Sequence, residues 1–134
     1  MVCATALEFL KIVEGENLLE NVRARGVELR EGLTALAAKF DFIREIRGEG
    51  LMLGIELSVE GAPFVTEAMN RGLLINCTHD NTLRLLPPFI VTRAQVREFL
   101  RLMERVFTIA PRVVATAESQ PVGTPARAAR VAAR

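Results

Sequence analysis

The stretch FDFIREIRGEGLMLGIELS, residues 40–58, constrains the fold most, because its apolar side chains repeat with a period of two. The alternating apolar residues in its second half are Leu51, Leu53, Ile55 and Leu57. Residues at every second position fall on one side of an extended chain, which is the pattern of a strand with one face on a core. Gly48 and Gly50 mark a turn between two strands. The stretch therefore predicts a strand pair with one buried face.

The first residues have helical spacing instead. Residues 2–14, VCATALEFLKIVE, carry apolar side chains at helical spacing, and we expect Gly15 to end this helix in a left-handed turn. No capping residue precedes Val2, so we expect the severed end of a longer helix.

A second helix is predicted from Asn17 to about Lys39, because Asn17 followed three residues later by Glu20 is a capping signal. Its apolar stripe is Leu18, Val22, Leu29, Leu33, Leu36 and Phe40. Gly26 lies on the same face, where the absence of a side chain would let another backbone come close. This helix is therefore expected to pack on the sheet.

A third, short helix is predicted over residues 62–71 and is closed by Gly72. We expect Val65, Ala68 and Met69 to be its inward-facing residues.

Two more strands are predicted at GLLIN, residues 72–76, and TLRLLP, residues 82–87, joined by the polar stretch at 77–81. Thr92 and Gln95 then form a capping box at the start of a last helix. Its core stripe is Val96, Phe99, Leu100, Met103, Val106 and Phe107.

The order of these elements predicts an α+β fold, with a mainly antiparallel sheet of about four strands covered by helices on one face. Residues 1–15 are interpreted as a truncated helix, and residues 16–109 as one domain. Residues 110–134 are rich in alanine, arginine and proline, and we expect them to form a disordered tail.

The composition limits the classes of partner. With 17 Lys and Arg against 16 Asp and Glu, the net charge of +1 gives no electrostatic argument for nucleic acid or an anionic membrane surface. No apolar run approaches the roughly 20 residues of a membrane span, and no signal pattern follows Met1. Cys3 and Cys77 are too few for a disulfide framework and are interpreted as packing residues. We therefore expect a cytoplasmic protein.

One charged residue interrupts the apolar run NTLRLLPPF at 81–89. Arg84 would hold its guanidinium against packed hydrocarbon unless an anion meets it. Two kinds of partner stay open: the carboxylate of a ligand, or an internal salt bridge to Glu49, Glu56 or Asp80. The two prolines that follow must end or bend the sheet, so Arg84 is expected at the end of an element, where sites are usually built.

The other motifs favour structural roles. RGEG at 47–50 lacks the strand, glycine triplet and helix order of a dinucleotide site, so we interpret it as a turn. Cys77 and His79 have no second pair at metal-ligand spacing and no orienting group, so neither a metal site nor a catalytic thiol is expected. Lys11 and Lys39 lie on predicted amphipathic helices, which do not provide the desolvated pocket of a Schiff-base lysine.

Three segments of the chain resemble the C-terminal part of the enzymes of the acetylornithine aminotransferase family. These are class III pyridoxal-phosphate enzymes of arginine biosynthesis. The segments are VCATALEFLKIVEGENLLENV, IREIRGEGLMLGIEL and RGLLINCTHDNTLRLLPPFIVT, in that order. The resemblance covers about residues 2–107. The family's large α/β domain carries the cofactor lysine, the aspartate beneath the pyridine nitrogen and most phosphate contacts, and none of its motifs is present here.

The resemblance implies that Arg84, in the LR-x-x-PP motif, binds the α-carboxylate of acetylornithine or glutamate and so orients the substrate toward the cofactor. Gly48 and Gly50 match the RG-x-G turn that lines the substrate entrance, with a structural role. The resemblance also implies pyridoxal phosphate as the cofactor, an amino-acid or 2-oxo-acid substrate, and a homodimer. No catalytic, cofactor-binding or metal-binding residue is expected within this chain, which should not transaminate alone.

Two other interpretations stay open. One is a free-standing α+β binding or interaction module that has the fold without the catalysis. The other is part of a different class III aminotransferase, acting on ornithine, succinylornithine or aminobutyrate.

Overall fold

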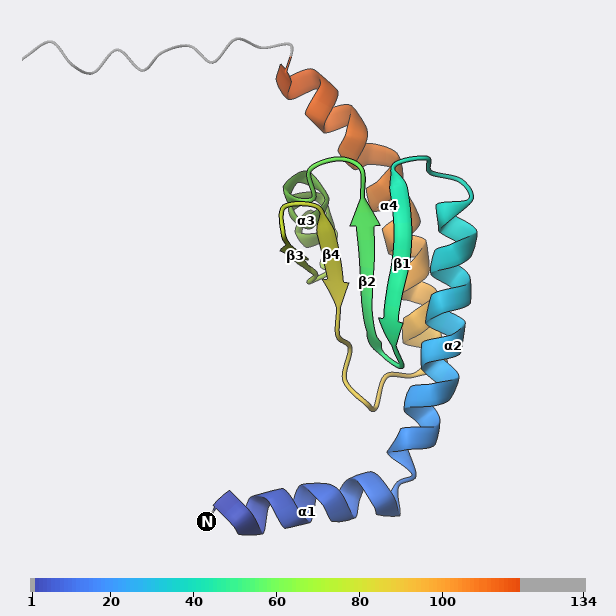
Figure 1. Cartoon of the computed structure of the whole chain (residues 1–134), viewed down its shortest axis with the longest axis vertical. Helices are drawn as coiled ribbons and strands as arrows, with labels where there is room; N and C mark the ends of the chain where they lie inside the picture. Colours follow the sequence, from blue (N-terminus) through green and yellow to red (C-terminus); the bar gives the residue numbers. More distant parts are fainter. Residues whose placement is uncertain (1, 119–134) are drawn as a thin grey trace, which may run out of the picture.

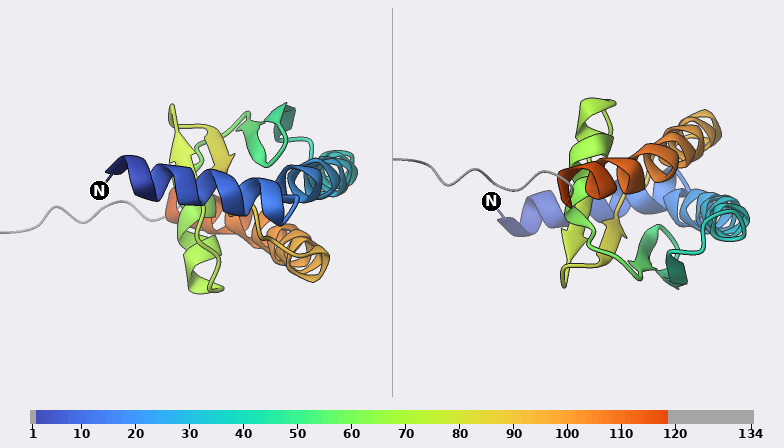
Figure 2. Two further views of the ribbon diagram at one scale, coloured as in Figure 1. Left: turned by 90° about the horizontal axis from the view of Figure 1, so that it is seen from below. Right: turned by 90° about the horizontal axis from the view of Figure 1, so that it is seen from above.

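The structure of this chain is a computed structural model that describes residues 2–118, and the described residues form four helices and one four-stranded sheet (Figure 1). The elements are α1 Val2–Gly15, α2 Leu18–Ala37, β1 Ile43–Glu49, β2 Met52–Leu57, α3 Ala62–Asn70, β3 Asn76–Thr78, β4 Thr82–Leu85 and α4 Arg93–Glu118. The strand order is β1-β2-β4-β3, and every neighbouring pair is antiparallel. Helices α2, α3 and α4 lie on one face of this sheet (Figure 1, Figure 2). The predicted α+β fold is therefore confirmed.

The predicted period of two appears directly in β2. Leu53, Ile55 and Leu57 are buried toward the helices, whereas Met52 is exposed. On the two sides of β2, Ile55 pairs with Ile46 of β1 and with Leu83 of β4. The helix-facing side of the sheet is therefore a continuous apolar surface.

The third strand is shorter than predicted and lies later in the chain. We expected residues 72–76, but β3 is Asn76–Thr78, and Leu74 is almost fully exposed. Continuing the register of β3 and β4 would place Leu73 opposite Pro87. Proline has no N–H for the ladder, so the pairing cannot reach residues 72 and 73.

The start of α2 also differs from the prediction. Asn17 precedes α2, but it adopts a left-handed conformation with φ 51° and makes no side-chain capping hydrogen bond. Gly15 is the last residue of α1 and is not among the left-handed residues, so the turn between the two helices is made at Asn17. Asparagine tolerates this conformation better than most residues, because its short polar side chain bonds locally.

The other predicted helix ends compare as follows. The Thr92 capping box is confirmed, because the backbone N–H of Gln95 donates to Thr92 Oγ1 at 3.3 Å and that of Thr92 donates to Gln95 Oε1 at 2.9 Å. Gly72 follows α3 with φ 75°, as expected. The prediction for Met69 was wrong: this side chain is exposed, and Phe64 is the large buried residue of α3.

The centre of the core is a cluster of four aromatic rings behind the sheet. The rings are Phe40, Phe42, Phe64 and Phe107, and their contacting pairs have centroids between 5.3 and 5.9 Å apart. Such pairs contribute about 0.5–1.5 kcal/mol each beyond the area that they bury. Because the rings come from the α2–β1 connection, α3 and α4, the cluster holds the whole helical layer together.

Helix α4 extends further than predicted. We expected the tail to begin at residue 110, but the helix continues past Pro111 to Glu118. The rest of the predicted tail, residues 119–134, lies outside the described residues.

Helix α1 packs on α2 and not on the sheet, and it extends sideways from the lower end of α2 (Figure 1, Figure 2). Val13 is its buried residue. Phe9 and Leu10 are more than half exposed, and Cys3 is exposed as well. The interpretation of Cys3 as a packing residue was therefore wrong, because no residue of the described range covers its side chain.

Gly26 makes the close backbone approach predicted for it. A Cβ atom on Gly26 would lie 2.6 Å from the carbonyl oxygen of Gly50, in the turn between β1 and β2. Real Cβ atoms do not approach backbone so closely, so α2 and this turn would have to separate.

We therefore predict that Gly26→Ala lowers the free energy of unfolding by about 1–2 kcal/mol, because overpacking outweighs the gain in helix propensity. Gly15→Ala is the matched control, since a Cβ there meets nothing within 4 Å. This control should leave stability unchanged or raise it by up to about 1 kcal/mol. Urea unfolding of the two variants measures both values, and equal stabilities would contradict the close approach.

Candidate functional site

Arg84 lies on the open face of the sheet, one residue before the end of β4. Its neighbours Leu83 and Leu85 are buried toward the helices, and successive side chains of a strand point to opposite faces. Arg84 pairs with Gly54 of β2 on one side and with Asn76 of β3 on the other. The guanidinium is therefore exposed, and the expectation that it would lie against packed hydrocarbon was wrong, because Leu83 and Leu85 point to the other face. The strand that holds it is hydrogen-bonded on both sides.

The internal salt bridges considered for Arg84 are not formed. Among the side chains that the structure describes, Arg84 has no ion pair and no hydrogen bond. Glu56, one of the candidate partners, instead accepts a hydrogen bond from Arg47. The described part of the chain therefore leaves the Arg84 guanidinium without an anion.

A second arginine on the same face is neutralised. Arg47 of β1 binds Glu56 of β2, and its Nη1 lies 3.1 Å from Glu45 Oε2. The hydrogen bond to Glu56 raises the pKa of Arg47 above its ordinary value. Sequence reasoning missed this cluster, although its signal is present: Glu45 and Arg47 stand two residues apart in a strand and so share a face.

Gly48 and Gly50 form the turn between β1 and β2. Both have positive φ, 132° and 52°, and a Cβ on Gly48 would lie 2.0 Å from the carbonyl oxygen of Met52. Arg30 of α2 donates a hydrogen bond to the carbonyl oxygen of Gly48. In Figure 1 this turn lies at the same end of the sheet as the connection that follows β4. That these glycines line a substrate entrance stays a prediction.

Cys77 and His79 lie in different surroundings. Cys77 pairs with Leu83 and is half-buried, and burial raises the pKa of its thiol. His79 is exposed in the β3–β4 connection, with φ 52°. Within the described residues, no three His, Cys, Asp or Glu side chains are placed to hold a metal ion.

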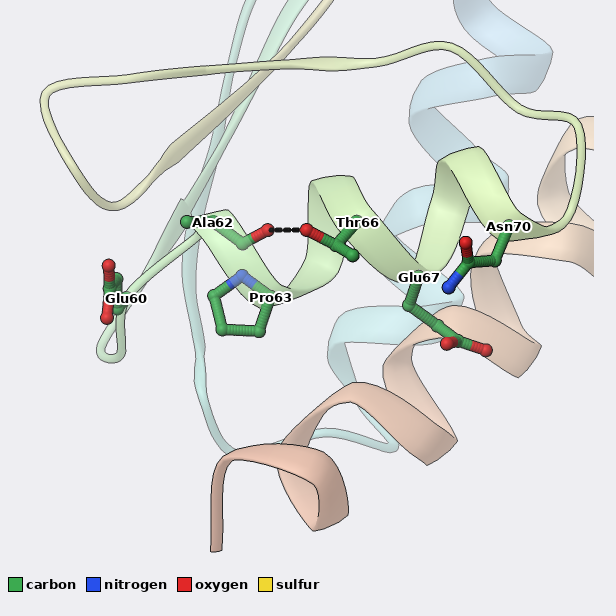
Figure 3. A pocket seen from close by; sticks show the side chains of 6 residues that line it. All are labelled: Glu60, Ala62, Pro63, Thr66, Glu67 and Asn70. Carbon is green, nitrogen blue, oxygen red and sulfur yellow. Dashed lines mark hydrogen bonds between the residues drawn. The ribbon is translucent and has the colours of Figure 1, made fainter. Parts of the chain in front are cut away.

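A hollow lies beside α3, away from Arg84 (Figure 3). Its lining residues are Glu60, Ala62, Pro63, Thr66, Glu67 and Asn70. Thr66 Oγ1 donates to the Ala62 carbonyl oxygen at 3.2 Å, and Glu67 is paired with Arg71. Thr66 and Glu67 are therefore satisfied within α3 and its end.

Comparison with known proteins identifies the family. Residues 1–107 match the family described as aminotransferase class-III. The chain belongs to the class III aminotransferases. An acetylornithine aminotransferase of Caldanaerobacter subterraneus subsp. tengcongensis is 39% identical over 109 residues, which are 81% of this chain and 28% of that protein. An ornithine aminotransferase of Bordetella pertussis is 39% identical over 99 residues, 72% of this chain and 23% of that protein.

Solved structures of class III aminotransferases have the same fold. The crystal structure of acetylornithine aminotransferase from Elizabethkingia anophelis superposes with a TM-score of 0.75 and 29% identity, over 79% of this chain and 29% of that one. The chain therefore spans less than a third of the length of the relatives it matches.

Class III aminotransferases depend on pyridoxal phosphate, and the lysines of this chain do not fit that group. Lys11 is exposed and pairs with Glu8 at 3.2 Å, and Lys39 is exposed and pairs with Glu104 at 2.7 Å. A Schiff-base lysine needs a desolvated pocket, whereas both of these side chains are exposed on helix surfaces. We therefore assign no cofactor contact within the described residues.

The helices of residues 2–118 include none that is long and apolar enough to cross a membrane.

We predict that Cys77 reacts with a thiol reagent more slowly than Cys3 in the folded protein. A raised pKa lowers the fraction of thiolate, which is the reactive form, and half-burial limits access. Cys3→Ser and Cys77→Ser isolate each thiol, and at about pH 8 we expect a rate ratio of about ten-fold. Raising the pH should accelerate Cys77, and unfolding in urea should make the two rates similar. Equal rates in the folded protein would contradict the burial of Cys77.

Proposed function

We propose that this chain is the C-terminal small-domain part of an acetylornithine transaminase and that Arg84 binds the α-carboxylate of the substrate. The observation that carries this proposal is the unpaired guanidinium of Arg84 on a strand bonded on both sides. A guanidinium grips a carboxylate with two parallel hydrogen bonds, and a rigid strand fixes the direction of that grip.

Gly54 supports access to this site. It lies between Arg47 and Arg84 in the register of the open face and carries no side chain. A Cβ at this position would meet Thr82 Cγ2 at 3.4 Å, which is an ordinary contact distance, so it is the glycine itself that keeps this position beside Arg84 free of a side chain. The glycine therefore leaves room for a ligand beside the guanidinium.

Acetylornithine is the proposed amino donor because acetylornithine aminotransferases are among the relatives, at 35–41% identity. Ornithine is the second candidate, because an ornithine aminotransferase is 39% identical over a shorter stretch. In both cases an α-carboxylate is present for Arg84, so the proposed role of the arginine is the same.

The rest of the enzyme supplies the cofactor site in this proposal. Amino transfer from the donor to 2-oxoglutarate would then require a large domain that holds pyridoxal phosphate, and the chain alone is expected to be inactive. We also propose a cytoplasmic location and a homodimeric enzyme.

We predict that N-acetyl-L-ornithine shifts the Arg84 side-chain N–H signals in an NMR titration of the chain, with a weak affinity of about millimolar or above. The carboxamide of the same compound should leave these signals in place, because it offers no anion. Arg84→Gln should abolish the response and Arg84→Lys should weaken it, since lysine keeps the charge but loses the planar fork. Arg44→Gln, on exposed Arg44 of β1, is the matched control and should bind as the wild type does.

A chimera extends this test to amino transfer. Residues 1–107 replace the matching segment of the Caldanaerobacter enzyme, and kcat/KM is measured with and without the same substitutions. Arg84→Gln is expected to lower kcat/KM by about 100-fold, because the substrate loses its orientation. An active chimera that is indifferent to Arg84→Gln would refute the carboxylate role.

The exposed apolar surface of α1 is also explained by this proposal. Its exposed apolar residues are Val2, Leu7, Phe9, Leu10 and Ile12, and those of the β4–α4 connection at the same end of the molecule are Leu86, Phe89 and Ile90. Monomers rarely expose apolar patches of such extent, so we propose that the rest of the enzyme covers this surface.

We predict that the isolated chain self-associates through α1 as its concentration rises. Phe9→Glu should reduce this association, because it places a charge on the uncovered apolar surface. Ala4→Glu adds the same charge about 140° away around the helix and should change little. Sedimentation velocity over a concentration series measures the effect. A wild type that stays monomeric throughout, or equal effects of the two variants, would contradict the prediction.

A further inference from the structure

The side chain of Asn21 joins two segments that are far apart in the sequence. Asn21 lies in the second turn of α2, and its Nδ2 donates to the carbonyl oxygen of Phe89 at 2.7 Å and to that of Val91 at 3.0 Å. A side-chain amide has two N–H donors, so this geometry employs both of them. Asparagine is a weaker helix former than alanine, so local helix propensity does not explain its presence here.

The segment that Asn21 holds is the connection from β4 to α4. Pro87 and Pro88 contribute no backbone donors, and the turn in this segment is closed by one bond, from the Val91 N–H to the Pro88 carbonyl oxygen at 3.0 Å. Leu86, Phe89 and Ile90 are exposed, so their side chains do not attach the connection to the core. Asn21 therefore supplies the long-range polar attachment of this segment, next to the buried Val91.

Helix α2 attaches the other connection at the same end of the sheet as well. Gly26 lies against the backbone of Gly50, and Arg30 donates to the carbonyl oxygen of Gly48. Gly26 and Arg30 are four residues apart and so share one side of α2, whereas Asn21 precedes Gly26 by five residues and lies about 140° away around the helix. Both connections at the end of the sheet where β4 terminates are thus attached to one rigid helix (Figure 1).

Arg84 is close in the chain to the segment that Asn21 holds. Arg84 is followed by Leu85, the last residue of β4, and Pro87 and Pro88 restrict rotation between β4 and Phe89. A displacement of the connection is therefore transmitted to the last residues of β4.

We infer that Asn21 is a positioning residue for Arg84, acting through the carbonyl groups of Phe89 and Val91. Its hydrogen bonds hold the β4–α4 connection, and the connection holds the end of β4 and the direction of the guanidinium. The consequence for carboxylate binding rests on the proposed function of Arg84, whereas the structural claim does not.

The test compares Asn21→Asp and Asn21→Ala with the wild-type chain by NMR. Aspartate has nearly the same shape but cannot donate to the two carbonyl groups, and alanine removes the amide while favouring the helix. Both variants are expected to speed amide exchange at Val91 and to change the Arg84 side-chain N–H signals. The affinity for N-acetyl-L-ornithine should fall about ten-fold, because a bidentate pair reduced to one bond loses one charge-assisted hydrogen bond.

Asn70→Asp on α3 is the matched control, since it makes the same chemical change at an exposed residue away from the connection. It should leave the Arg84 signals, Val91 exchange and ligand affinity unchanged. If both Asn21 variants lower only the unfolding midpoint and leave the Arg84 signals as in the wild type, the inference is overturned.

A failure of the proposed function gives a different result. In that case the wild-type chain does not respond to N-acetyl-L-ornithine, while the Asn21 variants still alter Val91 exchange and the unliganded Arg84 signals. Val91 exchange and the Arg84 signals measured without the ligand therefore test the positioning role of Asn21 independently.

Discussion

The antiparallel pairing of β2 with β4 decides which side chains meet the core and which face outward. Leu53 with Leu85 and Ile55 with Leu83 lie on the helix-facing side, so the intervening pair, Gly54 and Arg84, must lie on the open side. A slip of the β2–β4 pairing by one residue would bury the Arg84 guanidinium and expose Leu83 and Leu85. Both changes cost folding free energy. The burial of apolar side chains therefore determines where the one charged residue of β4 points.

The helices packed behind the sheet hold the paired strands rigidly in this register. The aromatic cluster joins α3 and α4 behind the sheet, and α2 is attached to the sheet's end through backbone contacts at Gly26 and Gly50. No described helix covers the open face, and charged side chains of β1 and β2 pair with one another there. Arg47 is bound by Glu45 and Glu56, whereas Arg84 has no ion pair with any side chain of residues 2–118 that the structure describes.

Much of this architecture could be predicted from local patterns, because period-two burial in β2 and the Thr92 capping box each depend on residues close in the sequence. The errors arose where distant residues decide the outcome. The length of β3 depends on the proline opposite Leu73, and the exposure of Met69 depends on how α3 lies on α4. Whether Arg84 meets a ligand carboxylate or an internal salt bridge stayed open for the same reason, since its candidate internal partners lie on other strands and turns.

The contrast between Arg47 and Arg84 bears on how such a sheet can recognise an anion. Both guanidinium groups are on one face, in neighbouring positions of one register row on either side of Gly54. Arg47 already has two carboxylates, so an added anion would have to displace or approach like charges there. At Arg84 the described residues offer no competing anion, and both adjoining strands hold its backbone in place. Because an orienting group must be unpaired before the ligand arrives and rigid afterwards, Arg84 meets the requirement that Arg47 does not.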